Sequence, residues 1–169
     1  MAASIQFYQT NGTAPGSDTA QGTGGGSNDW DFKDIDTVGT SGSGEEIVAG
    51  DFSFHVYIKA RFTGSFSSVD NVKYYASSLS LTGYGNDAYL IASGIPVANY
   101  ADPTAASMSG TWDAIPVLAA SGIDITTAGL IAGTAGYTDY VGLQLKTTIS
   151  GAAAGTGGST SFTMVWDES

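Results

Sequence analysis

The sequence contains no cysteine, a single histidine and few basic residues. Only 5 of the 169 residues are Lys or Arg, against 16 Asp or Glu, and the formal net charge is −11. Without cysteine there is no disulfide framework and no cysteine-ligated zinc or iron–sulfur site, and one histidine cannot build a multi-histidine metal site. The acidic balance argues against a protein that binds the phosphate backbone of nucleic acids.

Charged residues of both signs are scarce, and glycine is abundant. The charged fraction is 12%, about half the usual ~25%. Glycine supplies 24 residues, about twice its usual share of ~7%. The 42% of hydrophobic residues is enough for one core in one domain. The polar surface must consist mainly of Ser, Thr, Gly, Asn and Asp, which are poor helix formers, so the composition predicts an all-β protein.

Long apolar runs are also missing. No stretch of about 20 apolar residues exists, so we expect no membrane-spanning helix. The first residues, Met1 to Ile5, lack the basic and apolar regions of a signal peptide. We therefore expect synthesis in a cytoplasm and no membrane partner.

The clearest positive signal is strict alternation of apolar and polar residues from Asp51 to Phe62, typical of a strand with one buried face. The expected core face consists of Phe52, Phe54, Val56, Ile58, Ala60 and Phe62. The expected solvated face consists of Ser53, His55, Tyr57, Lys59 and Arg61.

A second alternating strand is predicted from Asp139 to Ile149. Its expected core residues are Val141, Leu143, Leu145, Thr147 and Ile149. Its opposite face holds Tyr140, Gln144, Lys146 and Thr148.

Shorter strands are predicted at intervals typical of sandwiches. They are Val69 to Ala76, Leu79 to Leu81, Ala88 to Ala92, Thr111 to Leu118, Ile123 to Ile125 and Ser159 to Trp166. Single helical turns are expected at 101–109 and 128–132, and a long hairpin tip at 150–158. The sequence therefore predicts an antiparallel two-sheet β-sandwich, jelly-roll or immunoglobulin-like, with roughly eight strands.

The first 28 residues have a different composition from the rest. A short apolar run, Ile5 to Tyr8, precedes a Gly/Ser/Thr-rich stretch from Asn11 to Asn28. This stretch has little apolar surface to bury, so we expect a flexible arm at 1–28 that orders only against a neighbouring subunit, ahead of a single domain at 29–169. The alternative is that Ile5 to Tyr8 pairs within its own sandwich.

No catalytic residue can be assigned. His55 is the one side chain that could serve as a general base near neutral pH, but no Gly-x-Ser-x-Gly elbow exists to carry a nucleophile. The glycines at 22–26 neither follow a strand nor precede a Gly-Lys-Ser/Thr sequence, so no phosphate-binding loop is predicted. We expect a non-enzymatic protein without a cofactor.

Two acidic pairs are candidate ion sites. Asp29 with Asp31, and Asp34 with Asp36, could offer carboxylates to Ca²⁺, which prefers several oxygen ligands. No EF-hand pattern is present, so a plain acidic loop is the expected reading and no metal site is assigned.

Aromatic and basic residues offer binding surfaces instead. Tyr84, Tyr100 and Tyr137 could stack on sugars or dock on protein, although packing is the usual role of such rings. Lys59, Arg61, Lys73 and Lys146 all fall in predicted strands, where they could form a solvated face or dock an acidic partner.

From about Asp29 onward, several short segments in order resemble small structural proteins of tailed-phage particles. These segments are Trp30 to Lys33, Ile47 to Gly50, Phe62 to Phe66, Val69 to Tyr74, Val141 to Lys146 and Thr163 to Glu168. None of them is a catalytic motif. The resemblance implies a virion protein, most like a capsid decoration (cement) protein or a related head or tail component, made in a host cytoplasm.

Such a protein would contact the major capsid protein or other virion proteins and neighbouring copies of itself. The alternative is a carbohydrate- or cell-surface-binding module, such as a tail-fibre domain, which a concave aromatic groove would favour. A small hydrolase would instead require a cleft that holds His55 or paired acids with perturbed pKa values.

Overall fold

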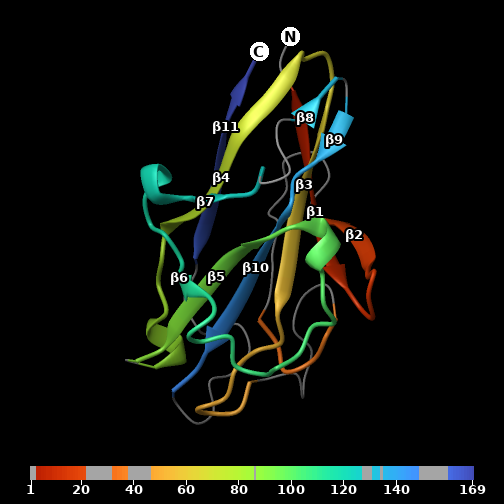
Figure 1. Cartoon of the computed structure of the whole chain (residues 1–169). Helices are drawn as coiled ribbons and strands as arrows, with labels where there is room; N and C mark the ends of the chain where they lie inside the picture. The colour runs from red at the N-terminus through yellow and green to blue at the C-terminus, as the bar shows by residue number, and fades with distance from the viewer. Residues whose placement is uncertain are drawn as a thin grey trace.

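A computed structural model describes residues 3–21, 32–37, 47–85, 87–126, 131–133, 135–148 and 160–169. The fold is an all-β sandwich of two antiparallel sheets (Figure 1), as the composition and alternation predicted. Its strands are β1 (Ser4–Asn11), β2 (Ser17–Gln21), β3 (Val56–Thr63), β4 (Ser68–Ser78), β5 (Tyr89–Ile95), β6 (Asp113–Ala114), β7 (Ile123–Asp124), β8 (Ile131–Ala132), β9 (Ala135–Tyr137), β10 (Tyr140–Lys146) and β11 (Ser161–Glu168). Three single 3-10 turns are η1 (Thr82–Tyr84), η2 (Val97–Asn99) and η3 (Ala119–Ser121).

The two sheets differ in size. The larger sheet has seven strands in the order β2-β1-β3-β10-β5-β6, with β9 also paired to β3. The smaller sheet has four strands in the order β11-β4-β7, with β8 also paired to β4. The described residues form eleven strands instead of roughly eight, because β6, β7, β8 and β9 have only two or three residues and leave no alternation to read.

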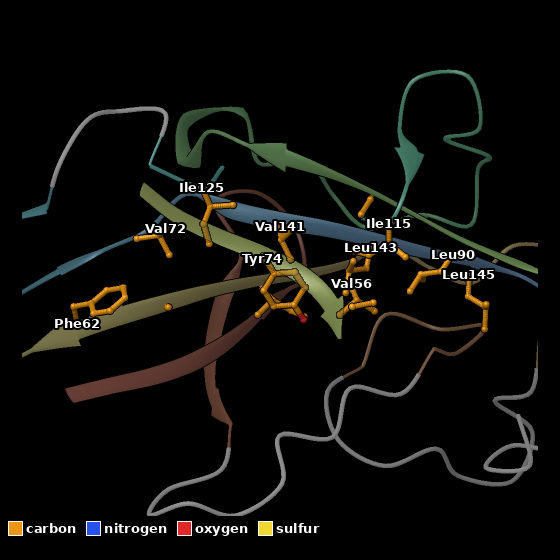
Figure 2. Close-up of a cluster of buried hydrophobic side chains, with 14 of the residues drawn as sticks. Val56, Phe62, Val72, Tyr74, Leu90, Ile115, Ile125, Val141, Leu143 and Leu145 are labelled. Atoms are coloured by element: carbon orange, nitrogen blue, oxygen red, sulfur yellow. The ribbon is translucent and has the colours of Figure 1, made fainter. Parts of the chain in front are cut away.

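The main core lies between the sheets. Val56, Ile58 and Phe62 of β3 and Leu143 and Leu145 of β10 are buried there, as predicted. Figure 2 shows Val56, Phe62, Leu143 and Leu145 in one cluster with Val72 and Tyr74 of β4. Phe52 and Phe54, which were also predicted for the core, are only half-buried because the regular strand begins at Val56. Ile149, the remaining predicted core residue of the second strand, lies outside the described residues.

The opposite face of the larger sheet is buried too, which corrects the predicted solvated face. A covering segment at residues 96–112 crosses β3 and β10 and places Tyr100 and Trp112 over the sheet. Ser53, His55, Tyr57, Tyr140 and Gln144 are buried rather than solvated, and Lys59 is buried as well, against Asp18 and Tyr140. The alternation predicted which residues share a face of the strand. It could not predict that a loop would cover the polar face.

Gln144 shows how the covering segment is held. Its side chain is fully buried and makes three hydrogen bonds to the main chain. Its Nε2 donates to the carbonyls of Ser53 (3.0 Å) and Ala106 (2.9 Å), and its Oε1 accepts from Met108 N–H (3.0 Å). A buried amide must satisfy its polar atoms, so Gln144 ties the segment to β10.

The N-terminal residues belong to the sandwich. β1 lies between β2 and β3, and its Ile5 and Phe7 side chains pack against the main core. The predicted flexible arm is thus wrong for residues 11–21, which form a turn and β2; residues 22–28 lie outside the described residues. Main-chain pairing, together with a 2.6 Å bond from Thr10 Oγ1 to Asp18, orders a segment that has little apolar surface.

Other local predictions also change. Leu79 to Leu81 is not a strand and leads instead into η1, and no helical turn forms at 101–109. Of 128–132, the described residues Ile131 and Ala132 form β8, while the predicted hairpin tip at 150–158 lies outside the described residues. No helix in the described parts of the chain is long and apolar enough to cross a membrane.

Candidate functional site

His55 is enclosed between β3 and the covering segment. The side chain is 6% exposed, and its ring centroid lies 5.1 Å from that of Trp112. Its Nε2 is 3.3 Å from the Ala106 carbonyl, and its buried Nδ1 has no hydrogen-bond partner among the described residues. Burial lowers the pKa of His55, with the Ala106 bond opposing this shift. Among the described residues, the His55 side chain is therefore enclosed rather than open to solvent.

The neighbouring serine is equally enclosed. Ser53 is fully buried, and its Oγ donates to the Phe54 carbonyl (2.8 Å) and accepts from Leu145 N–H (3.1 Å). Its hydroxyl thus serves the junction with β10. The pairing of a serine nucleophile with His55 has no support in this geometry.

Of the two acidic pairs, Asp34 and Asp36 lie in the described part of the chain. Asp29 and Asp31 lie outside the described residues. Asp36 accepts a 2.7 Å hydrogen bond from Gly12 N–H, while Asp102 accepts a 2.6 Å bond from Ala14 N–H. Burial raises the pKa of Asp36, and the nearby Asp102 charge raises it further against the lowering effect of the Gly12 bond.

These two carboxylates clamp the turn between β1 and β2. Tyr100 completes the clamp by donating its hydroxyl to the Gly12 carbonyl (2.8 Å). The pKa of Tyr100 is raised far above its usual value, first by burial and then by the charge of Asp36. Within the described ranges no group of three or more His, Asp or Glu side chains could hold a metal ion.

Lys59 of β3 forms a compact polar cluster on the outer face of the larger sheet, which is the face opposite the main core. Its Nζ lies 2.8 Å from Asp18 Oδ2 and donates to the Tyr140 hydroxyl (3.2 Å). The ammonium also lies 4.9 Å from the centroid of the Tyr137 ring. Burial opposes the charge of Lys59, but the hydrogen bonds to Asp18 and Tyr140 outweigh it and raise the pKa. Lys59 thus joins β2 to β3.

Arg61, Lys73 and Lys146 lie in strands as predicted. The Arg61 guanidinium lies 5.6 Å from the centroid of the Tyr137 ring, and Tyr137 is 46% exposed. Tyr84 and Tyr100, the other predicted stacking candidates, are half-buried. Arg61 and Tyr137 therefore form the accessible aromatic and basic part of the outer face.

An exposed apolar tip lies at the junction of the two sheets. Val117 is 52% exposed and Leu118 65% exposed. The loop before them is fixed to both sheets, because Ile115 N–H donates to Leu90 O of β5 (3.1 Å) and Ala76 N–H of β4 donates to Pro116 O (2.8 Å). This apolar tip (Val117 and Leu118) is thus presented to solvent on a fixed support.

An open surface depression of about 390 Å³ lies beside this tip, on the outer face of the smaller sheet. It is lined by Asn71, Lys73, Ala119, Ala120, Val165, Trp166 and Asp167. We call it the bulge pocket, because Asn71 sits at an irregularity in the pairing of β4 with β11. The pocket was not predicted from the sequence, although Asp70 and Asn71 interrupt the apolar alternation of their strand.

Comparison with known proteins gives no identification. No protein-family model matches the chain, and no curated protein or solved structure matches it significantly.

Proposed function

We propose that this protein is a non-enzymatic structural protein of a viral particle. It decorates the capsid surface through contacts with the major capsid protein and with neighbouring copies of itself. The proposal takes its setting from the resemblance of the sequence to tailed-phage virion proteins. The observation that carries it is the apolar tip.

The apolar tip has the properties of a docking element. Val117 and Leu118 expose apolar surface that burial against a partner would stabilise by about 25 cal/mol per Å². Because hydrogen bonds to Leu90 and Ala76 already hold the preceding loop, little conformational entropy remains to be lost on binding. Pre-ordering of this kind favours a structural contact.

A second part of the surface supports the same role. Arg61 and the exposed ring of Tyr137 lie together on the outer face of the larger sheet. Arginine and tyrosine are enriched among residues that dominate binding energy at protein interfaces. We expect Arg61 to pair with a carboxylate of the partner. This is the role in docking an acidic partner that the sequence suggested for the basic residues in strands.

The candidate chemical groups have structural roles. His55 lies behind Trp112, Asp36 holds Gly12, and Lys59 is paired with Asp18. These interactions explain the unusual residues of the outer face without a reaction. They support a non-enzymatic role.

Decoration would stabilise a particle by mass action. A ligand that binds only the assembled state stabilises it by RT ln(1 + [L]/Kd). Repeated placement on a symmetric lattice would let several weak contacts act together.

If the proposal holds, the genome that encodes this chain also encodes a major capsid protein, and the test is binding to particles assembled from that protein. We expect the wild-type protein to co-sediment with these particles and Leu118→Asp to bind at least about tenfold more weakly, since a charge would be buried at the contact. The matched control is Leu79→Asp, which alters another exposed apolar residue, on the loop before η1. No binding by the wild-type protein, or equal binding by Leu118→Asp, would contradict the proposal.

A further inference from the structure

The bulge pocket forms around the one residue other than glycine that has a left-handed backbone in the described chain. Asn71 has φ 49°. Lys73 pairs with Val165, while Asp70 pairs with Asp167, so two residues of β4 face Trp166 alone. Bulges of this kind redirect side chains and are common beside binding sites, and a backbone outlier is a reason to look for function.

The bulge pocket is open to solvent, and its size matches that of a small ligand. Its volume of about 390 Å³ falls within the ~300–1,000 Å³ of typical small-molecule sites. Asn71 and Lys73 come from β4, the alanines Ala119 and Ala120 from η3, and Val165 to Asp167 from β11. The pocket thus combines apolar surfaces from two elements with polar groups from two strands.

The polar groups offer donors and acceptors together. Asn71 Nδ2 donates a 2.7 Å hydrogen bond to Asp167 Oδ2. This bond orients both side chains and leaves the Asn71 carbonyl oxygen and the second Asp167 oxygen as acceptors. Lys73 adds N–H donors and has no ion pair among the described residues. A hydroxyl group can accept from Lys73 and donate to Asp167 at the same time.

The local charge selects against an anion. Lys73 is the single cation of the pocket, whereas Asp167 lines it, Asp124 pairs across from Lys73 and Asp70 precedes Asn71. Carboxylates therefore outnumber the ammonium group. The alanine and valine methyl groups favour a ligand that also has C–H surface.

We propose that the bulge pocket binds a neutral polyhydroxylated ligand, a saccharide, through Asn71, Lys73 and Asp167. Recognition is by hydroxyl groups rather than by ring stacking, because the Trp166 ring faces the core and packs against Phe62 at 5.4 Å. This site goes beyond the proposed capsid role and would add glycan attachment to it. Sugar binding and particle binding are measured separately, so the absence of one leaves the test of the other intact.

The test is an NMR titration of the full chain with the methyl glycosides of glucose, galactose and mannose. With at least one sugar we expect saturable shifts at the Asn71 side-chain amide, Lys73 and the Trp166 indole. Lys73→Met and Asp167→Asn should each weaken this binding by about tenfold, since each removes a charge-assisted hydrogen bond. Lys146→Met, which removes a lysine packed on Phe52 and Tyr89, is the control and should bind as the wild type does.

Several results would overturn the proposal. These are no saturable shift with any of the three sugars, shifts centred on other residues, or unchanged affinity in both pocket variants. Saturable binding of inorganic phosphate at the same residues without sugar binding would also overturn it, because it would assign the pocket to anions. Thermal unfolding of each variant separates loss of binding from loss of fold.

Discussion

Trp112 packs on the backbone of Gly142 so closely that a Cβ at Gly142 would lie 2.5 Å from Trp112 Cη2. The covering segment and β10 therefore fit together only because residue 142 has no side chain. This contact seals the outer face of the larger sheet above Tyr57 and Tyr140. The aromatic layer depends on a glycine in the middle of a strand.

Gly142→Ala should therefore destabilise the fold by about 1–3 kcal/mol, as overpacking of a filled site does. Urea unfolding measures the change. Trp112→Phe, which removes the interfering part of the indole, is the companion variant. In a double-mutant cycle the alanine should cost less in the Trp112→Phe background than in the wild type. Simple additivity of the two substitutions would show that the contact does not limit residue 142.

His55 should make stability depend on pH. Burial lowers its folded pKa below the 6.5 of a free histidine, so the unfolded chain binds the proton more readily. This contribution is complete above pH 6.5 and should be lost as the pH falls from 6.5 toward the folded pKa. His55→Gln, which retains a donor for the Ala106 carbonyl, should remove that part of the acid sensitivity. Equal pH dependence in both proteins, measured by urea unfolding, would refute the assignment.

The ionisation of Asp36 should change stability with pH in the opposite direction to that of His55. Its folded pKa is raised above the ordinary 3.8, so its ionisation disfavours the fold above the folded pKa, and this penalty disappears as the pH falls to 3.8. Asp36→Asn keeps an acceptor for Gly12 N–H and removes the charge next to Asp102. At neutral pH we expect this variant to be at least as stable as the wild type in thermal unfolding. A clear loss of stability there would mean that the carboxylate charge itself supports the turn.

Two phenylalanines of the predicted core strand should respond differently to truncation. Phe62 is fully buried, and Phe62→Ala should cost about 3–5 kcal/mol. Phe54 is half-buried ahead of β3, so Phe54→Ala should cost clearly less. Denaturant unfolding compares the pair directly. Equal losses would place Phe54 in the same core as Phe62.

The sequence by itself determined the fold class and the main core. Alternation from Val56 to Phe62 and from Val141 to Leu145 is a local property of each strand, so it can be read without knowing the partner strand. The scarcity of helix-forming charged residues likewise specified an all-β chain. The local strand patterns also placed four basic residues in strands, namely Lys59, Arg61, Lys73 and Lys146.

Tertiary structure decided what each polar residue contacts. His55 and Lys59 looked solvated because their strand alternates. The covering segment, more than 30 residues away in the sequence, encloses His55 through Ala106 and Trp112, whereas Lys59 is enclosed by Asp18, Tyr137 and Tyr140. The Ser17–Gln21 strand forms because β1 offers main-chain partners that compensate for its missing apolar surface. The bulge pocket needs Asn71, Ala119 and Asp167 from three distant segments. Such contacts depend on how segments meet in space, and the local pattern of any one segment carries no record of its neighbours.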